Sequence, residues 1–277
     1  MKIACNFSLE LEQLIKENKV DIDYYKYPGL GFHTNVMNNL EQFKSFVSRL
    51  TKPVLLHGVH PAPHNLSETD LIEKFDFSTV NQLINITNTP GLSFHPSRTA
   101  IDPSTNTTEL VNTIVKNVCF IKKHYSNMQF ITLENVDGDR FGDLIKPEIF
   151  TEIIDKSDCG FLLDISHAVC ATRYLNVNIQ DYLKRLPLHK IYEIHINGWI
   201  IDNNNRFMAH TKITNESYDI LKNVLEVANP KIITIEYGRS NDKISAGIPL
   251  LSPNSINEMA KDEIVEQVNK IKSLVLQ

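Results

Sequence analysis

Histidine and carboxylate side chains recur at, or just beyond, the ends of short apolar runs along this chain. The runs read LLHGVH, LSFHPS, ITLEN, FLLDISH, IYEIH and ITIEYG, and a further histidine stands in MAHT. Imidazole nitrogens and carboxylate oxygens are the ligands that proteins offer to Fe, Mn and Zn. The pattern therefore predicts a metal centre, and its candidate ligands are His57, His95, Glu134, Asp164, His167, His195, His210 and Glu236.

Three of these residues, Glu134, Asp164 and Glu236, are acidic and stand at the ends of strands that read as buried. A single histidine or carboxylate in such a place usually has a structural role. Several carboxylates together are different, because buried charge is costly unless something neutralises it. Shared divalent cations would do so, and we therefore expect the three carboxylates to be catalytic groups as well as ligands.

Spacing predicts how the ligands would be shared. In the D-x-x-H segment, Asp164 would end a strand and His167 would return from the first helical turn. Glu134 directly follows an apolar strand and can bridge two cations, with His57 and His95 each binding one side.

Strand-like runs alternate with helix-like segments through the whole chain, and this alternation predicts a parallel sheet. Two further runs, IACNF and IDYYKY, bring the number of strands to eight, which predicts closure. We therefore expect an α/β protein with a single (β/α)8 TIM barrel as one domain over residues 1–277. The expected helices are Leu9–Glu17, Met37–Leu50, Phe77–Thr87, Glu109–His124, Pro147–Ile154, Ile179–Arg185, Tyr218–Ala228 and Asn257–Val275.

Polar loops follow the strands and would gather at the carboxyl rim, where barrel enzymes keep their sites. His210 lies in an expected loop, fifteen residues after His195, and would serve a second metal. Trp199 and Arg239, each just beyond a rim strand, are candidate substrate contacts. Cys170, one turn after His167, reads as a small buried helix residue.

Composition excludes several classes of protein. The net charge is −5 and Lys and Arg do not cluster, so a nucleic-acid partner is not supported. No run approaches the roughly 20 apolar residues of a membrane span, and the start of the chain lacks a signal-peptide pattern. The four cysteines have no metal-finger spacing and read as buried free thiols. A cytoplasmic protein is expected.

Taken in order, these motifs resemble the xylose-isomerase-like barrels of the endonuclease IV type. VLLHGV, FLLD and LPLHKIYEIHINGW (Leu186–Trp199) most resemble the multinuclear iron-dependent oxidases that modify ribosomal peptides. The resemblance spans about Pro53–Gly238 and implies two or three divalent metal ions, with Fe favoured over Zn or Mn. It also implies a peptide substrate and a small peptide-recognition protein as partner. The matching ligand positions are His57, His95, Glu134, Asp164, His195 and Glu236.

The chain departs from this pattern around the loop histidine, His210, where an Asp two residues before it and the glycine-rich sequence usual in the oxidases are both missing, and the second difference implies a different substrate. His167 matches the D-x-x-H histidine of the endonuclease-like branch, whereas the oxidases often have Asn in this neighbourhood. Both groups of relatives place an Asp two residues before the loop histidine, and here that position is Met208. The shell of a third metal is therefore incomplete, with Asp202 as a distant substitute.

The sequence is compatible with three functions. The leading hypothesis is an iron oxidase that modifies a peptide with O₂, at cysteine. A zinc phosphodiesterase of the endonuclease IV kind is favoured by D-x-x-H, although basic loops are missing. A sugar isomerase or epimerase would bind one metal through four ligands, which would be Glu134, Asp164, His195 and Glu236. The other candidate histidines would then have no role.

Overall fold

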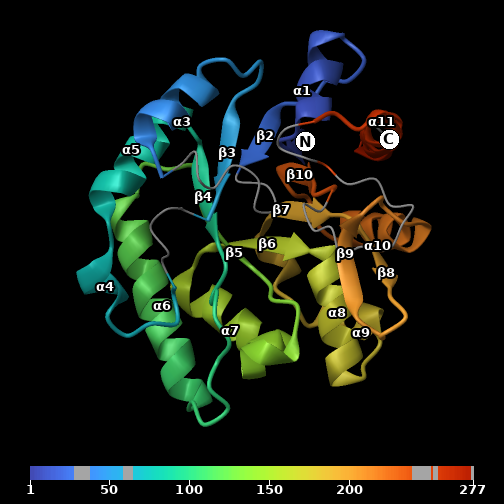
Figure 1. Ribbon diagram of the computed structural model, residues 1–277. Coiled ribbons are helices and arrows are strands. Elements are labelled where there is room, and N and C mark those ends of the chain that lie inside the picture. Colours follow the sequence, from blue (N-terminus) through green and yellow to red (C-terminus); the bar gives the residue numbers. More distant parts are fainter. Residues whose placement is uncertain (28–37, 59–64, 239–250, 252–254, 276–277) are drawn as a thin grey trace.

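A computed structural model describes residues 1–27, 38–58, 65–238, 251 and 255–275 of the protein, and its centre is a closed barrel of parallel strands (Figure 1). The order around the barrel is β1–β10–β7–β6–β5–β4–β3–β2. The predicted (β/α)8 barrel is therefore confirmed. The strands are β1 (Lys2–Asn6), β2 (Tyr24–Tyr27), β3 (Val54–His57), β4 (Gly91–Phe94), β5 (Phe130–Glu134), β6 (Gly160–Asp164), β7 (Ile191–Ile196) and β10 (Ile232–Ile235).

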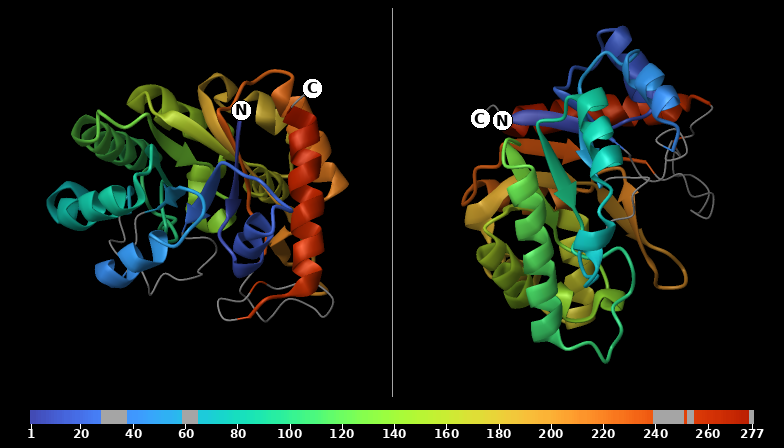
Figure 2. Two further views of the ribbon diagram at one scale, coloured as in Figure 1. Left: turned by 90° about the horizontal axis from the view of Figure 1, so that it is seen from above. Right: turned by 90° about the vertical axis from the view of Figure 1, so that its left-hand side faces the viewer.

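Helices surround the barrel, and α11 packs against α1 beside the strands that close it (Figure 2). Each helix buries one face; in α6 that face includes Leu110, Ile114, Val118 and Ile121, and Asn106 caps its N-terminus. The helices are α1 (Leu9–Lys16), α3 (Leu40–Val47), α4 (Leu71–Lys74), α5 (Phe77–Thr87), α6 (Thr107–His124), α7 (Pro147–Ser157), α8 (Ile165–Leu175), α9 (Ile179–Lys184), α10 (Asn215–Leu225) and α11 (Glu258–Val275), with short 3-10 helices at Asp139–Ile145 and Leu188–Lys190.

The structure adds a hairpin that the sequence did not predict, formed by β8 (Gly198–Ile201) and β9 (Phe207–Thr211). Residues Asp202–Arg206 form its turn, in which Asp202 accepts hydrogen bonds from the backbone N–H groups of Asn204 and Arg206. Gly198 is required where the hairpin leaves the barrel, because an added Cβ would lie 1.7 Å from the Lys212 carbonyl oxygen.

The interior of the barrel changes from apolar to polar along the strands. Its floor is a cluster of Ala4, Leu55, Phe130 and Ile232. Side chains alternate along a strand, so the residue two positions further on faces the interior again. On β5 this sequence runs from Phe130 through Thr132 to Glu134, and on β10 it runs from Ile232 through Thr234 to Glu236. Each of these strands thus places an acidic side chain at its carboxyl end. Below that side chain lie a polar layer and then an apolar layer of the barrel interior.

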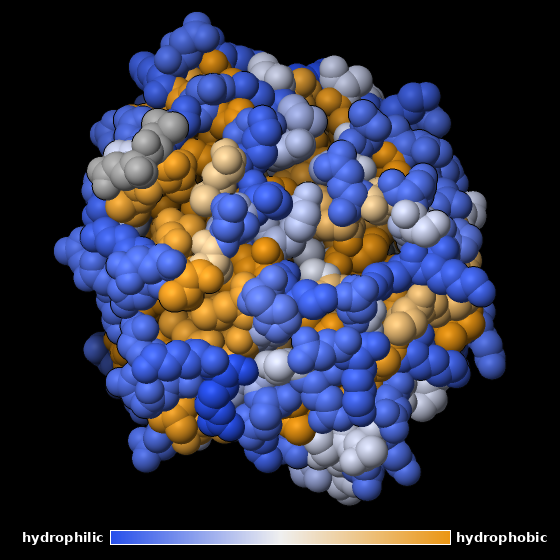
Figure 3. Space-filling view, turned by 180° about the vertical axis from the view of Figure 1, so that it is seen from behind, coloured by the Kyte–Doolittle hydropathy of each residue, from blue (hydrophilic) through white to orange (hydrophobic). Residues whose placement is uncertain are grey.

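The surface mixes apolar areas with polar side chains on the face seen in Figure 3. Large exposed hydrophobic residues lie on separate elements, such as Tyr174 on α8, Ile201 on β8 and Met259 on α11. Isolated residues of this kind are normal on a folded protein. Within the described part of the chain, no helix is both long enough and apolar enough to cross a membrane.

Candidate metal centre

The structure places the candidate ligands at the carboxyl ends of neighbouring barrel strands. His57, Glu134 and Asp164 are the last residues of β3, β5 and β6, and His195 is the next to last residue of β7. The remaining barrel ligands directly follow a strand or begin the helix after it: His95 after β4, His167 in the first turn of α8 and Glu236 after β10. This is the rim at which (β/α)8 enzymes build their sites.

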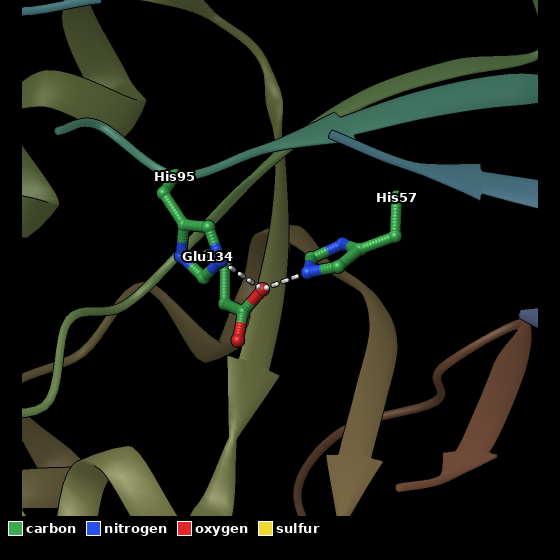
Figure 4. A group of neighbouring side chains, drawn as sticks. All are labelled: His57, His95 and Glu134. Atoms are coloured by element: carbon green, nitrogen blue, oxygen red, sulfur yellow. Dashed lines mark ion pairs between the residues drawn. The ribbon is translucent and has the colours of Figure 1, made fainter. Parts of the chain in front are cut away.

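Glu134 lies at the centre of this group and is almost fully buried. Its Oε2 lies 3.2 Å from His57 Nε2 and 3.6 Å from His95 Nε2, and Figure 4 shows both rings pointing at this oxygen. Its Oε1 lies 3.2 Å from His167 Nδ1 and 3.7 Å from His195 Nδ1. Each oxygen therefore lies near a different pair of imidazoles. His57 Nε2 faces Oε2 and His195 Nδ1 faces Oε1, which is the arrangement of a bridging carboxylate.

Three groups of side chains in the described residues have ligand atoms that lie within 4.8 Å of one another. Two of the groups share Glu134, and two share His57, so the groups adjoin. Seven of the eight predicted ligands are members, and only His210 belongs to none of the three. The groups are His57 with His95 and Glu134, His57 with His195 and Glu236, and Glu134 with Asp164 and His167.

The donor set fits a cluster of cations. Glu134 Oε2 and His195 Nδ1 are buried and have no hydrogen-bond partner. Buried polar atoms are nearly always satisfied, so such orphaned atoms call for a ligand. A divalent cation satisfies a carboxylate oxygen and an imidazole lone pair together.

The spacing of the D-x-x-H segment follows from helix capping. Asp164 caps α8: its Oδ1 accepts hydrogen bonds from the His167 backbone N–H at 2.8 Å and from the Ser166 hydroxyl at 2.7 Å. Its Oδ2 faces the centre, 4.0 Å from His167 Nε2. Asn197 Nδ2 donates to this second oxygen at 3.4 Å. One carboxylate thus begins the helix and offers a ligand atom.

Asn135 supports the same pair. Its side chain accepts from the Asp164 N–H at 2.8 Å and donates to the Asp164 carbonyl at 3.0 Å. Its own carbonyl lies 2.8 Å from His167 Nδ1. A carbonyl only accepts, so Nδ1 carries the proton and the lone pair of Nε2 is free for a metal. Sequence reasoning gave Asn135 and Asn197 no role, since an amide beside a ligand has no pattern of its own.

His210 lies in strand β9, not in the expected loop, and approaches the centre from its edge. Its Nδ1 is 3.6 Å from Glu236 Oε2, and Glu236 Oε1 is 3.2 Å from His195 Nδ1. The His210 backbone has a φ of 66°, a left-handed conformation that is unfavourable outside glycine. Its N–H donates to Asn197 Oδ1 at 3.0 Å, which helps to hold the ring near Glu236.

Neither position considered for a further carboxylate beside His210 provides one. Met208 is buried two residues before His210, on the same strand. Asp202, the distant substitute, is bound instead to the Arg206 guanidinium in the hairpin turn, with 2.6 Å between Oδ2 and the nearer guanidinium nitrogen. The described residues thus give His210 no carboxylate from either position.

Burial and charge act in opposite directions on the titration of this centre. Burial lowers the pKa of His57 to about 3 and also lowers the pKa of His95, so both rings are neutral and ready to bind a metal. Burial would lower the pKa of His167 too, but the carboxylates of Asp164 and Glu134 raise it to about 9. Cations would displace the protons that these carboxylates hold on neighbouring imidazoles such as His167.

The other predicted residues lie around this centre. Trp199 is on β8 and stacks on Phe207 of β9, with ring centroids 5.8 Å apart. Cys170 is buried on α8 as expected, and burial raises the pKa of its thiol to about 12. Three of the four cysteines are buried, but Cys119 is exposed, which corrects the expectation for that residue. Arg239 lies outside the described residues.

Comparison with known proteins gives one family match that covers most of the chain. Residues 10–246 match the model described as RiPP precursor modification enzyme MbnB/TglH/ChrH, where RiPP denotes a ribosomally made and then modified peptide. A UPF0276 protein of Psychromonas ingrahamii is 21% identical over 230 residues, which are 75% of this chain and 79% of the relative. A UPF0276 protein of Anaeromyxobacter sp. strain Fw109-5 is 27% identical over 154 residues, or 53% and 54% of the two chains.

Solved structures show a similarity of fold alone. D-psicose 3-epimerase from Clostridium cellulolyticum H10 has a TM-score of 0.63 at 12% identity, over 99% of each chain. Endonuclease IV from Thermus thermophilus has a TM-score of 0.56 at 10% identity, also over 99% of each chain. Xylose-isomerase-like and endonuclease IV-like barrels are therefore the structural neighbours, as the motifs indicated.

Proposed function

Because the chain belongs to the MbnB/TglH/ChrH family of RiPP precursor modification enzymes, we propose that it oxidises a ribosomally made peptide with O₂ at a centre of two or three iron ions. The modified residue would be a cysteine. The observation that carries the proposal is Glu134, whose two oxygens each face two imidazoles from separate elements. One buried carboxylate in that position supports a multinuclear centre over a single ion.

The ligands would have different roles in this centre. Glu134 would hold two cations, and the neutral rings of His57 and His95 would bind them without adding charge. Asp164 and Glu236 would balance the positive charge of the ions. Bound iron would supply the redox capacity that oxidation by O₂ needs. Burial of Glu134, Asp164 and Glu236 would keep bulk water away from the inner part of the centre.

A peptide substrate is the family's implication, and the finer proposals follow from it. We propose that a separate small protein recognises the peptide and that the enzyme works in the cytoplasm. Trp199, stacked on Phe207 in the hairpin, is proposed to contact the peptide at the rim.

A zinc phosphodiesterase is the second candidate, and one observation favours it. Asp164 and His167 form a group with Glu134, which supports a further cation bound through D-x-x-H. The isomerase alternative has less support. A one-metal quartet gives no role to His57, His95 and His167, which all lie within 3.6 Å of a Glu134 oxygen.

One assay separates these functions. Iron-loaded, anaerobically purified protein is mixed with a cysteine-containing precursor peptide encoded beside its gene, with and without the neighbouring small protein, and O₂ is admitted. We expect a change in peptide mass that requires O₂ and iron and is lost when the peptide cysteine is replaced by serine. Zinc-dependent cleavage of abasic DNA, or ketose turnover with one manganese per chain, by the same protein would contradict the proposal.

A further inference from the structure

A buried ion pair lies in the polar layer of the barrel interior, directly below the candidate metal centre. The Nζ of Lys26 on β2 lies 2.8 Å from both carboxylate oxygens of Glu193 on β7. It also donates to the hydroxyl of Ser93 on β4 at 3.1 Å. Lys26 and Glu193 are both fully buried. Thr234 on β10 adds a hydrogen bond to Glu193 Oε1, so strands from both sides of the barrel meet in this network.

Both acceptors of Lys26 also contact a candidate ligand. Glu193 Oε1 lies 3.1 Å from His195 Nε2, and Ser93 Oγ lies 3.0 Å from His57 Nδ1. In each ring the contacted nitrogen is the one that does not face the metal centre, because His195 Nδ1 and His57 Nε2 face Glu134. The Lys26 ammonium is therefore linked to two candidate ligands, to His195 through Glu193 and to His57 through Ser93.

These contacts determine where each ring carries its proton. A carboxylate only accepts hydrogen bonds, so Nε2 of His195 donates to Glu193 and the lone pair of Nδ1 is left for a cation. The Ser93 hydroxyl accepts from Lys26 and can place its own proton on the Leu56 carbonyl, 3.4 Å away. Its remaining lone pair then accepts the Nδ1 proton of His57, and Nε2 is left for a cation.

We propose that Lys26 is a positioning residue for one cation site: through Ser93 and Glu193 it sets which nitrogen of each imidazole is free to bind. The site is the group of His57, His195 and Glu236. The inference rests on the proposed metal centre. It implies that one cation site depends on Lys26 and that another does not. Neither His167 nor Asp164 contacts this network, and their group with Glu134 is held through Asn135 instead.

The test is a cobalt(II) titration of the full chain without oxygen, followed by absorption in the visible range. Lys26→Met alone would leave the Glu193 charge buried and unpaired, so the main variant is Lys26→Met with Glu193→Gln, which removes both charges. We expect the variant to keep the tightest site and to bind one further cation about 10–100-fold more weakly than wild type. Lys222→Met, at an exposed lysine of α10, is the matched control and should match wild type.

Ser93 provides a second test that leaves the ion pair intact. Ser93→Ala removes the contact to His57 and should weaken the same cation site. Ser93→Thr keeps the hydroxyl and should restore binding; threonine already occupies the neighbouring position, Thr132, opposite Ser93 in the sheet. If Ser93 had only a structural role, these variants would change the unfolding temperature of the metal-free protein. Cation affinity would then not be lost in Ser93→Ala and restored in Ser93→Thr.

The outcomes separate the two levels of the proposal. Failure of the wild type to take up two cations would overturn the multinuclear centre and the inference with it. Uptake of two cations by the wild type, with unchanged affinities in a folded double variant and in Ser93→Ala, would overturn only the role of Lys26.

Discussion

Asp164 and His167 approach each other twice, once through a hydrogen bond to the backbone and once between side-chain atoms in the candidate metal centre. Asp164 Oδ1 accepts the hydrogen bond of the His167 N–H at 2.8 Å, and its Oδ2 lies 4.0 Å from His167 Nε2. The cap fixes where α8 begins and therefore where the imidazole returns toward the rim. Structure and candidate chemistry thus depend on different oxygens of one carboxylate.

Two substitutions at this position separate those functions. Asp164→Asn keeps a side chain that caps a helix but loses the negative charge, whereas Asp164→Ala loses both. We expect both variants to lose the cation bound with Glu134 and His167. In chemical denaturation of the metal-free proteins, Asp164→Ala should be less stable than Asp164→Asn by about 1 kcal/mol. Equal stabilities of the two variants would show that the cap has no energetic role.

Removal of the metal should destabilise the protein. Without cations, the carboxylates of Glu134, Asp164 and Glu236 remain buried close together. A ligand present at 100 times its dissociation constant stabilises the folded state by about 2.7 kcal/mol, which for a chain of this size is roughly 5–10 °C. Thermal unfolding with and without a chelator measures the shift. An unchanged melting temperature in metal-loaded protein would contradict this expectation.

The cysteines should react unequally with an alkylating reagent. Burial raises the pKa of the Cys5 and Cys170 thiols to about 12 and that of Cys159 to about 11, whereas Cys119 is exposed. A raised pKa leaves the thiol protonated and unreactive at pH 8, and the reactive thiolate forms only as pH rises toward that pKa. Mass spectrometry of native protein should show one alkylated thiol per chain, and four after denaturation. Modification of buried thiols in the native state would contradict the packing.

Trp199 is the only tryptophan of the chain, so its fluorescence reports directly on the hairpin. Binding of the precursor peptide should shift its emission to shorter wavelength, as the ring leaves water. Trp199→Ala should raise KM by about tenfold, the equivalent of 1.4 kcal/mol, with unchanged metal content. Tyr174→Ala, at an exposed aromatic residue of α8, is the control. An unaltered KM in Trp199→Ala would remove this residue from the substrate site.

The barrel could be predicted because each strand carries its own signal. Apolar runs such as FLLD and KIITIE mark strands buried on both faces, and a ligand at their ends marks the rim. The hairpin carried no such signal, because its strands are short and its turn reads as an ordinary polar loop. The D-x-x-H spacing predicted a helical turn after Asp164 but not the bounds of α8; Asp164 ends β6 and caps that helix.

The partners of the ligands could not be predicted, because they come from distant parts of the chain. Lys26 and Glu193 are 167 residues apart, and no local pattern links them. In sequence, Lys26 reads as one polar residue among tyrosines. Asp202 shows the opposite case, in which a residue was proposed as a ligand on its position in the sequence. The structure shows that its carboxylate binds Arg206 instead.

The central claim is that Glu134 joins cations which histidines from separate strands complete, and counting the metal ions bound per chain tests it most directly. Elemental analysis should find at least two ions in anaerobically purified wild type, one fewer in His57→Ala or His95→Ala, and none in Glu134→Ala. Lys222→Met should match wild type. A wild-type protein that binds one ion or none, or a folded Glu134→Ala variant that keeps its full complement, would contradict the account.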